Sequence, residues 1–258
     1  MPRLLVPLCV ALCLALLGAC SQQTFEPKDQ RLFELRVYHP HEGKLEALHE
    51  RFREHTLALF EKHGMQHVGY WVTDEDAAKL VYIVAFEDEA ERDLAWANFV
   101  EDPEWKAAYA ESIVDGRLVQ KIDSTLMRTT DYSPAILQQV ATPTRVFELR
   151  TYKASEGRLV HLDQRFRGAT MDLFAKHGAT NLVYFHPVES SGGAGDTLVY
   201  LLAHDSRVAR EQMFRDFRED EEWKEVKAAS EVAAGGPLTV KGGVKSVMLL
   251  PTDYSKIQ

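Results

Sequence analysis

The chain contains two copies of one long sequence, and this repeat constrains the fold more than any other feature. Residues 33–70 and 147–184 are identical at 19 of 38 positions. The match continues to the same four residues, Thr-Asp-Tyr-Ser, at 130–133 and at 252–255. Solenoid repeats are about 20–50 residues long, whereas a period of this length corresponds to a whole small domain. We therefore expect two copies of one domain within a single chain.

The repeat boundaries divide the rest of the sequence. We assign residues 31–133 to the first domain, 134–144 to a linker and 145–258 to the second domain. Each domain is long enough to bury a hydrophobic core of its own. Residues 20–30 are polar and contain a proline, which is typical of a short tether. Residues 1–19 form a leader with a different composition.

The leader is typical of a bacterial lipoprotein signal peptide. Arg3 precedes an apolar run that is shorter than the roughly 20 residues of a membrane-spanning helix. The sequence LGAC at residues 17–20 resembles a lipobox. The resemblance implies cleavage before Cys20, which would become a lipid-bearing N-terminus. Several acyl chains on one cysteine hold firmly, because each buried methylene contributes about 0.8 kcal/mol.

The leader also predicts where the protein resides. The resemblance to lipoproteins implies a lipid-anchored protein of the cell envelope. Ser21 follows the cysteine, and in lipoproteins of two-membrane bacteria this residue implies the outer membrane, with the protein facing the periplasm. The three cysteines, Cys9, Cys13 and Cys20, all belong to this region. The folded part is therefore predicted to have no disulfide and no cysteine metal site.

The charge of the chain excludes one class of partner. Thirty Lys and Arg residues against 39 Asp and Glu residues give a net charge of −9. A nucleic-acid-binding protein usually carries a basic patch or stripe that neutralises phosphates. We therefore expect no nucleic-acid partner.

Each copy has the pattern of a split βαβ unit. Phe33–Tyr38, FELRVY, alternates between apolar and polar residues as a half-buried strand does. Residues 42–63 carry apolar side chains at helical spacing and end at Gly64. The elements expected next are strands at 67–72 and 80–86, a helix at 89–99, a helix capped by Asp102 and a strand at 121–128.

This order predicts an α+β fold. Strand, helix, strand, strand, helix, helix, strand is the order of a ferredoxin-like unit. Such a unit has helices on one face of its sheet and leaves the other face bare. Two bare faces can pack together. We expect the two tandem ferredoxin-like domains to form an intramolecular pseudo-dimeric α/β barrel with its helices outside.

The repeated motifs resemble those of the NIPSNAP family. They are FELRVY and FELRTY, Glu-Gly-Lys/Arg-Leu, Leu-Phe-x-Lys-His-Gly, the Glu-Trp-Lys segment and the closing Thr-Asp-Tyr-Ser. The resemblance covers residues 31–133 and 145–255. It implies the dimeric α/β-barrel superfamily, which includes cofactor-free monooxygenases, isomerases, haem enzymes and proteins without known activity. It supplies no catalytic residues.

The first strand of each copy supplies the candidate ligand-binding residues. If Phe33 and Leu35 pack on the helices, the alternate side chains point into the barrel. A concave pocket with a few convergent polar groups is then the expected binding site. The candidates from the first strands are Glu34, Arg36, Tyr38, Glu148, Arg150 and Tyr152, and a later strand of each copy adds Tyr82 and Tyr200. The alternative is a structural ion-pair ladder in a filled barrel, because buried charges need partners.

Histidines and cofactors give no firm site. His49 and His55 are six residues apart, which places them about 240° apart around a helix, whereas zinc sites of the zincin type need a spacing of four. His63 and His177 recur at helix ends, where a cation is favourable without any chemistry. We predict no metal and no cofactor. Haem binding stays an alternative, because one exposed histidine is enough to ligate the haem iron.

Three functions remain after these observations. The first is a membrane-tethered NIPSNAP-type protein that binds a small, partly apolar ligand or a protein partner in or around the barrel. The second is a cofactor-independent monooxygenase- or isomerase-like enzyme that uses the barrel cavity. The third is a surface interaction protein with a filled barrel. No nucleophile motif, dinucleotide fingerprint or Walker motif is present, so the sequence does not decide whether the protein is an enzyme.

Overall fold

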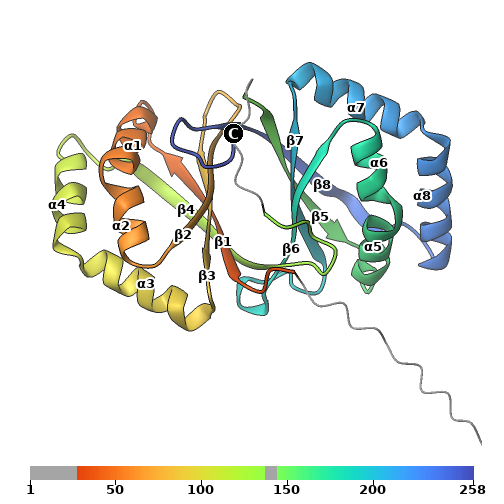
Figure 1. Ribbon diagram of the computed structural model, residues 1–258, viewed down its shortest axis with the longest axis horizontal. Helices are drawn as coiled ribbons and strands as arrows, with labels where there is room; N and C mark the ends of the chain where they lie inside the picture. The colour runs from red at the N-terminus through yellow and green to blue at the C-terminus, as the bar shows by residue number, and fades with distance from the viewer. Residues whose placement is uncertain (1–27, 137–143) are drawn as a thin grey trace, which may run out of the picture.

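The computed structural model describes residues 28–136 and 144–258, and the two repeats share one order of elements. Figure 1 shows the strands between two sets of helices, α1–α4 on one side and α5–α8 on the other. The first repeat comprises β1 (Leu32–Pro40), α1 (Leu45–Arg51), η1 (Phe52–Thr56), α2 (Leu57–Lys62), β2 (Gln66–Thr73), β3 (Leu80–Phe86), α3 (Glu89–Glu101), α4 (Pro103–Ser112) and β4 (Val119–Thr129). The second comprises β5 (Val146–Ala154), α5 (Leu159–Arg165), η2 (Phe166–Thr170), α6 (Met171–Lys176), β6 (Thr180–Pro187), η3 (Glu189–Ser191), β7 (Thr197–His204), α7 (Arg207–Glu219), α8 (Glu221–Ala233) and β8 (Thr239–Pro251).

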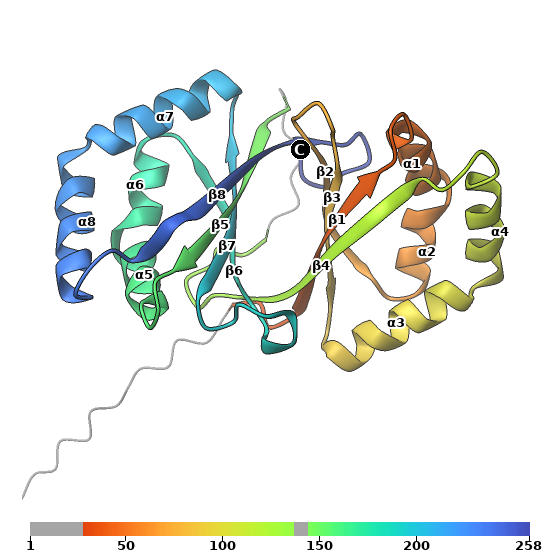
Figure 2. The same cartoon turned by 180° about the vertical axis from the view of Figure 1, so that it is seen from behind.

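The strands close into a single antiparallel barrel, as the repeat predicted. Their order around the barrel is β1-β3-β2-β8-β5-β7-β6-β4. The two repeats meet along β2–β8 and β4–β6, each seam with only three paired positions. Within a repeat, β1 pairs with β3 along its length and with β4 on its other side. The view from behind in Figure 2 shows the long strands β4 and β8 crossing the front of the barrel.

The barrel interior is filled with apolar side chains from both repeats. Phe33, Trp71 and Phe147 lie there and are completely buried. Phe33 and Phe185, from different repeats, have ring centroids 5.0 Å apart. A small hollow of about 120 Å³ beside this core is lined mainly by aliphatic side chains, among them Ile83. The centre of the barrel is therefore a packed core.

A second apolar layer lies between each sheet face and its helices. β3 is buried at all seven positions, because its alternate side chains enter the barrel core and the helix layer. A continuous apolar run is typical of a strand that is buried on both faces. The Asp102 side chain accepts a hydrogen bond from the backbone N–H of Glu104 and begins α4, with Pro103 in the first turn. Gly64 has φ +81°, the left-handed conformation expected of a glycine that ends a helix.

The long helix of each repeat contains one turn of π-helix. α1, η1 and α2 run without a break, and the Leu57 N–H donates to the Phe52 carbonyl across the wider turn. The Thr56 hydroxyl donates to the carbonyl of Arg51 at 3.1 Å. Insertions of this kind occur frequently at functional sites. The second repeat has the same turn in η2.

The Thr-Asp-Tyr-Ser segment of each repeat packs on the other repeat. In the second repeat, the backbone N–H of Thr252 donates to the Tyr70 carbonyl at 3.0 Å, and Ser255 Oγ accepts from the Tyr70 N–H at 3.0 Å. The first repeat does the same to Tyr184, through Thr130 and Ser133. We call residues 130–133 and 252–255 the two clasps, because each fastens one repeat to the other.

The expected leader and the first part of the tether lie outside the described residues. None of the helices in the described part of the chain has the length and apolar character that crossing a membrane requires.

Candidate functional site

The predicted site residues face the helices and not the barrel interior. The prediction that both first strands line one shared cavity is therefore wrong. Phe33 and Leu35 point into the barrel core. Their neighbours Glu34, Arg36 and Tyr38 therefore project to the opposite face of β1, under the helices. The counterparts in the second repeat lie under the other set of helices, on the far side of the barrel (Figure 1). The structure thus forms two separate clusters of these residues.

In the first repeat, Glu34 is surrounded by hydrogen-bond donors. It is fully buried and accepts from Arg36 Nη1 at 2.6 Å, from Trp96 Nε1 at 2.8 Å and from Ser124 Oγ at 2.7 Å. Arg92 of α3 also pairs with it, at 2.9 Å. Burial alone would raise the pKa of Glu34, but the hydrogen bond from Arg92 and the charge of Arg36 outweigh it and lower the pKa to about 2.

In the second repeat, Glu148 occupies the same position with one exchanged partner. Arg150 Nη1 lies 2.5 Å from it, and Arg210 and Ser246 also donate to it. His204 Nε2 lies 3.3 Å from Glu148. Burial opposes ionisation here too, but these donors hold the pKa of Glu148 below its usual range.

The exchange in the Glu148 cluster involves two positions at once. Trp96 donates to Glu34 in the first repeat, and Phe214 takes its place in the second. His204 in turn replaces Phe86 and brings its ring nitrogen toward the carboxylate. Both clusters are thus supplied with charge and hydrogen bonds from the protein itself, which supports a structural role for both glutamates.

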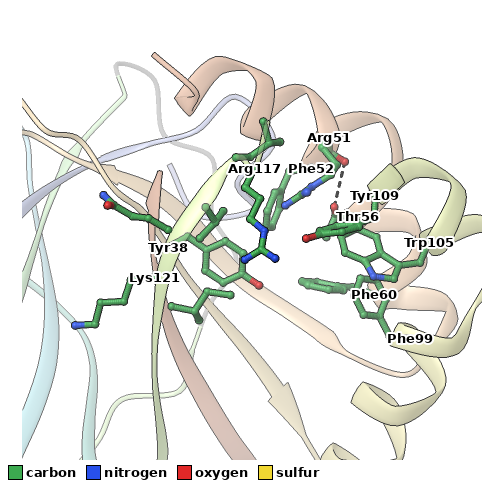
Figure 3. Close-up of a pocket in the computed structure, with 14 residues that line it drawn as sticks. Tyr38, Arg51, Phe52, Thr56, Phe60, Phe99, Trp105, Tyr109, Arg117 and Lys121 are labelled. Carbon is green, nitrogen blue, oxygen red and sulfur yellow. Dashed lines mark hydrogen bonds between the residues drawn. The ribbon is translucent and has the colours of Figure 1, made fainter. Parts of the chain in front are cut away.

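A pocket lies beside the Glu34 cluster, between β1, β4 and the helices of the first repeat. Its volume is about 300 Å³. Figure 3 shows Tyr38 and Arg117 on one side of it and Arg51, Trp105 and Tyr109 on the other. The aromatic part of its wall is formed by Tyr38, Phe52, Phe60, Phe99, Trp105 and Tyr109. Of the residues predicted from the sequence, Tyr38 lines this pocket.

Arg51 is the distinctive group of the pocket. The residue is 6% exposed, yet within the described residues no carboxylate forms an ion pair with it. Its guanidinium lies 5.2 Å from the centre of the Trp105 ring and 5.5 Å from that of Tyr109. Nη1 donates to Ser112 Oγ at 3.1 Å, and Nε is buried without a hydrogen-bond partner. Burial lowers the pKa of Arg51 from its usual value, and nearby phenol groups oppose this.

Two further cations lie at the rim of the pocket. Arg117 is exposed, and Lys121 forms an ion pair with Asp123 at 2.8 Å. The Tyr82 hydroxyl donates to the Tyr38 hydroxyl at 3.0 Å, so the Tyr38 proton is free to be donated into the pocket. The pocket thus presents cations and an O–H donor among aromatic rings. This combination suits a flat ligand that carries a negatively charged group.

A second hollow lies on the outer side of Arg51. Its volume is about 280 Å³, and it is lined by Glu50, Glu54 and Glu111. These carboxylates make the helix surface acidic, whereas the inner pocket is cationic. Arg51 therefore separates two surfaces of opposite charge.

Sequence reasoning missed Arg51 and its aromatic neighbours. The available signal was that Arg51 lies three residues after Leu48 and next to Phe52, on the apolar stripe of the helix. The same arginine recurs as Arg165 in the second copy. A charged residue that is repeated on a buried helix face is a stronger candidate for ligand binding than a charged residue on a strand whose two faces are both covered.

The recurring histidines lie where a structural role predicts them. His63 Nε2 lies 2.6 Å from Asp102 Oδ2, and His177 Nε2 lies 2.7 Å from Asp220 Oδ2. Asp102 is the N-cap of α4 and Asp220 is the N-cap of α8, so each histidine binds the capping residue of another helix. Among the residues that the structure describes, no group of three or more metal-ligating side chains could hold a metal ion.

Two sequence segments match one family model, NIPSNAP, at residues 33–134 and 147–256. The chain belongs to the NIPSNAP family. The two segments correspond to the two halves of the barrel, so this NIPSNAP protein carries two family units in tandem. No curated protein matches the chain.

Three solved structures that are similar to this chain differ in how much of it they cover. An anthrone oxidase-like protein has a TM-score of 0.58 and 14% identity, over 90% of this chain and 95% of the other. A NIPSNAP family protein with unknown function from Agrobacterium tumefaciens has 21% identity and a TM-score of 0.38, over 43% of this chain and 98% of its own. A NIPSNAP-like domain protein from Burkholderia xenovorans has 19% identity and a TM-score of 0.37, over 41% and 90%.

Proposed function

We propose that this NIPSNAP protein is a lipid-anchored envelope protein that binds a small, partly apolar anion in the pocket of its first repeat. The observation that carries the proposal is Arg51, a buried guanidinium that lines a pocket and has no ion-pair partner within the described residues. A buried charge is costly unless it is paired, so an anionic ligand would stabilise this site. Trp105, Phe60 and Phe99 supply an apolar surface for the rest of the ligand.

Native mass spectrometry with an absorption spectrum tests the ligand. A chain of residues 24–258 retains every described helix and strand, and it is produced in a bacterium with a comparable envelope. We expect one extra mass of a few hundred daltons per chain, and its loss from the Arg51→Gln variant. A chain that carries no ligand, and that binds none from a cell extract, would contradict the proposal and favour a protein that acts through its surface. A Soret band would identify haem as the ligand.

The proposed anchor rests on the leader sequence, and it is tested separately. Cys20 follows the residues LGA, as in a lipobox. We expect the full chain to incorporate labelled palmitate and to fractionate with the outer membrane. The Cys20→Ala variant should lose the label. A wild-type chain without label would contradict the proposed anchor, but it would not bear on ligand binding in the pocket.

A cofactor-independent oxygenase is the second candidate function. Its support is the fold shared with an anthrone oxidase-like protein, together with the groups around the pocket. Arg51, Arg117 and the Tyr38 hydroxyl could stabilise an enolate oxygen. Oxygen uptake in the presence of anthrone, compared between the wild type and Tyr38→Phe, tests this candidate. Uptake equal to that of a protein-free control would exclude anthrone as its substrate.

A further inference from the structure

We infer that the second repeat holds a second site for an aromatic anion, built around Arg165. This inference rests on the proposed function and adds a site on the other side of the barrel, so that one chain can bind two ligands. It starts from side chains of the first pocket that are identical at the corresponding positions of the second repeat. The pairs are Tyr38 and Tyr152, Arg51 and Arg165, Phe52 and Phe166, Thr56 and Thr170, Phe60 and Phe174, Phe99 and Phe217, and Trp105 and Trp223.

These side chains have the same geometry in both repeats. The Arg165 guanidinium lies 5.2 Å from the centre of the Trp223 ring, a distance that recurs between their counterparts in the first repeat. The rings of Phe217 and Trp223 have centroids 4.4 Å apart, and this distance recurs as well. The Thr170 hydroxyl donates to the Arg165 carbonyl at 3.1 Å, as in the first π-helical turn. The second repeat therefore reproduces the arrangement of the first pocket and not only its sequence.

Arg165 is buried without a charge partner, as Arg51 is. It is 9% exposed, and none of the ion pairs among the described residues includes it. Its Nε is buried without a hydrogen-bond partner, which is also true of Arg51 Nε. Burial lowers the pKa of Arg165, although nearby acidic groups, Glu231 among them, act in the opposite direction. A buried guanidinium that the protein leaves unpaired would be stabilised by an anion.

The exposed edge of the first pocket also recurs in the second repeat. Ile122 of β4 lies opposite Tyr38 of β1 and lines the first pocket. Val244 of β8 lies opposite Tyr152 of β5 in the same way. Both aliphatic side chains are 44% exposed, and Tyr152 is itself partly exposed. Solvent therefore reaches the strand side of the second site.

The rim of the second site carries a cation of its own. Pro237 stands at the position of Arg117. Lys227 of α8, however, stands at the position of Tyr109, four residues after Trp223 and so on the same face of the helix. Lys227 is exposed and belongs to none of the ion pairs of the part of the chain that the structure describes. Each site thus combines one buried guanidinium with a cationic rim, which suits a carboxylate or a sulfonate.

The exchange of Tyr109 for Lys227 removes one ring from the wall of the second site. Loss of one aromatic contact weakens binding by roughly two- to tenfold. We therefore expect the second site to release its ligand more readily during purification. The purified protein then retains the one ligand of the first pocket, and added ligand fills both sites.

Isothermal titration calorimetry of residues 24–258 with naphthalene-2-carboxylate, a flat aromatic anion, tests the inference. Native mass spectrometry first confirms that dialysis has removed any retained ligand, and it then counts the added molecules. We expect two per chain. Arg165→Gln should leave one, bound with the affinity of the first pocket, and Arg51→Gln should also leave one, bound more weakly. The neutral naphthalene-2-carboxamide should bind about tenfold or more weakly at both sites, because each buried cation then lacks its anion.

Lys227→Gln provides a further variant, because this side chain is exposed and its replacement leaves the core intact. It should weaken the second site several-fold and leave the first unchanged, and circular dichroism confirms that each variant is folded. A single site per chain that Arg51→Gln abolishes and Arg165→Gln leaves unchanged would overturn the inference, while the proposed function would stand. Absence of saturable binding, or binding that neither arginine substitution weakens, would overturn the proposed function as well.

Discussion

The hydroxyl of Tyr254 lies 2.7 Å from Nδ1 of His49, although 205 positions separate the two residues. The contact joins the clasp of the second repeat to helix α1 of the first. The matching contact of the other clasp runs from the Tyr132 hydroxyl to Asp163 Oδ1, also at 2.7 Å. The two clasps therefore share their backbone contacts but end on different partners, a histidine and a carboxylate.

Removal of a clasp serine should destabilise the barrel. Ser255→Ala leaves the buried N–H of Tyr70 without its acceptor, and Ser133→Ala does the same to Tyr184. A buried donor left unsatisfied costs about 1–3 kcal/mol. We expect each variant to lower the free energy of unfolding by this amount in urea titrations. Losses below about 0.3 kcal/mol in both would show that the clasps add little.

The clasp at His49 should weaken in acid. Burial lowers the pKa of His49 below its usual value, so the unfolded chain binds the proton more tightly than the folded one. The contribution of neutral His49 is complete above about pH 6.5 and is lost as the pH falls through the folded pKa. We expect His49→Gln to reduce the loss of stability between pH 7.5 and 5. The measurement is the difference in melting temperature between wild type and variant at each pH. An unchanged difference would contradict a role for this titration.

His186 should act in the opposite direction at the other clasp. Burial opposes its protonation, but Asp163 Oδ1 at 3.1 Å outweighs burial and raises the pKa of His186. Its contribution to stability is complete below about pH 6.5 and is lost as the pH rises through the folded pKa. His186→Gln should therefore cost more at pH 5.5 than at pH 8. Equal costs in thermal melts at the two pH values would show that its charge is unimportant.

The exchange between the two glutamate clusters predicts a compensating pair of substitutions. Trp96→Phe removes a donor from buried Glu34, which should cost about 1–3 kcal/mol. Phe86→His introduces the residue that lies beside Glu148 in the second repeat. We expect the double variant to be more stable than the sum of the single changes predicts, by at least about 0.5 kcal/mol in urea titrations. Additive costs would show that the two positions are not coupled through the glutamate.

The sequence predicted the architecture but not the direction in which the strands face. The alternation of β1 was clear, and the tandem copies predicted the closed barrel correctly. The direction stayed open because both faces of β1 are covered: Phe33 and Glu34 are each 0% exposed. Hydrophobic alternation normally separates core from solvent, and here it separates two buried layers.

The candidate site depended on partners that local patterns do not reveal. Arg92 and Trp96 of α3 lie 58 and 62 positions from Glu34, so no spacing rule connects them. The pocket likewise needs Trp105 and Arg117 from elements that meet only after the sheet has formed. The internal repeat could still have identified Arg51, because a buried helix face seldom keeps an arginine at the same position twice.

The narrow seams of the barrel have a consequence for biosynthesis. When the first repeat has been made and the second has not, β2 and β4 have no neighbours on their outer sides, and the apolar face that includes Phe33 and Trp71 is uncovered. Free strand edges and a large apolar surface pair readily with other chains. A chain that ends after the first repeat is therefore expected to associate with other chains, and only the second repeat of the same chain covers both of these edges and the apolar face.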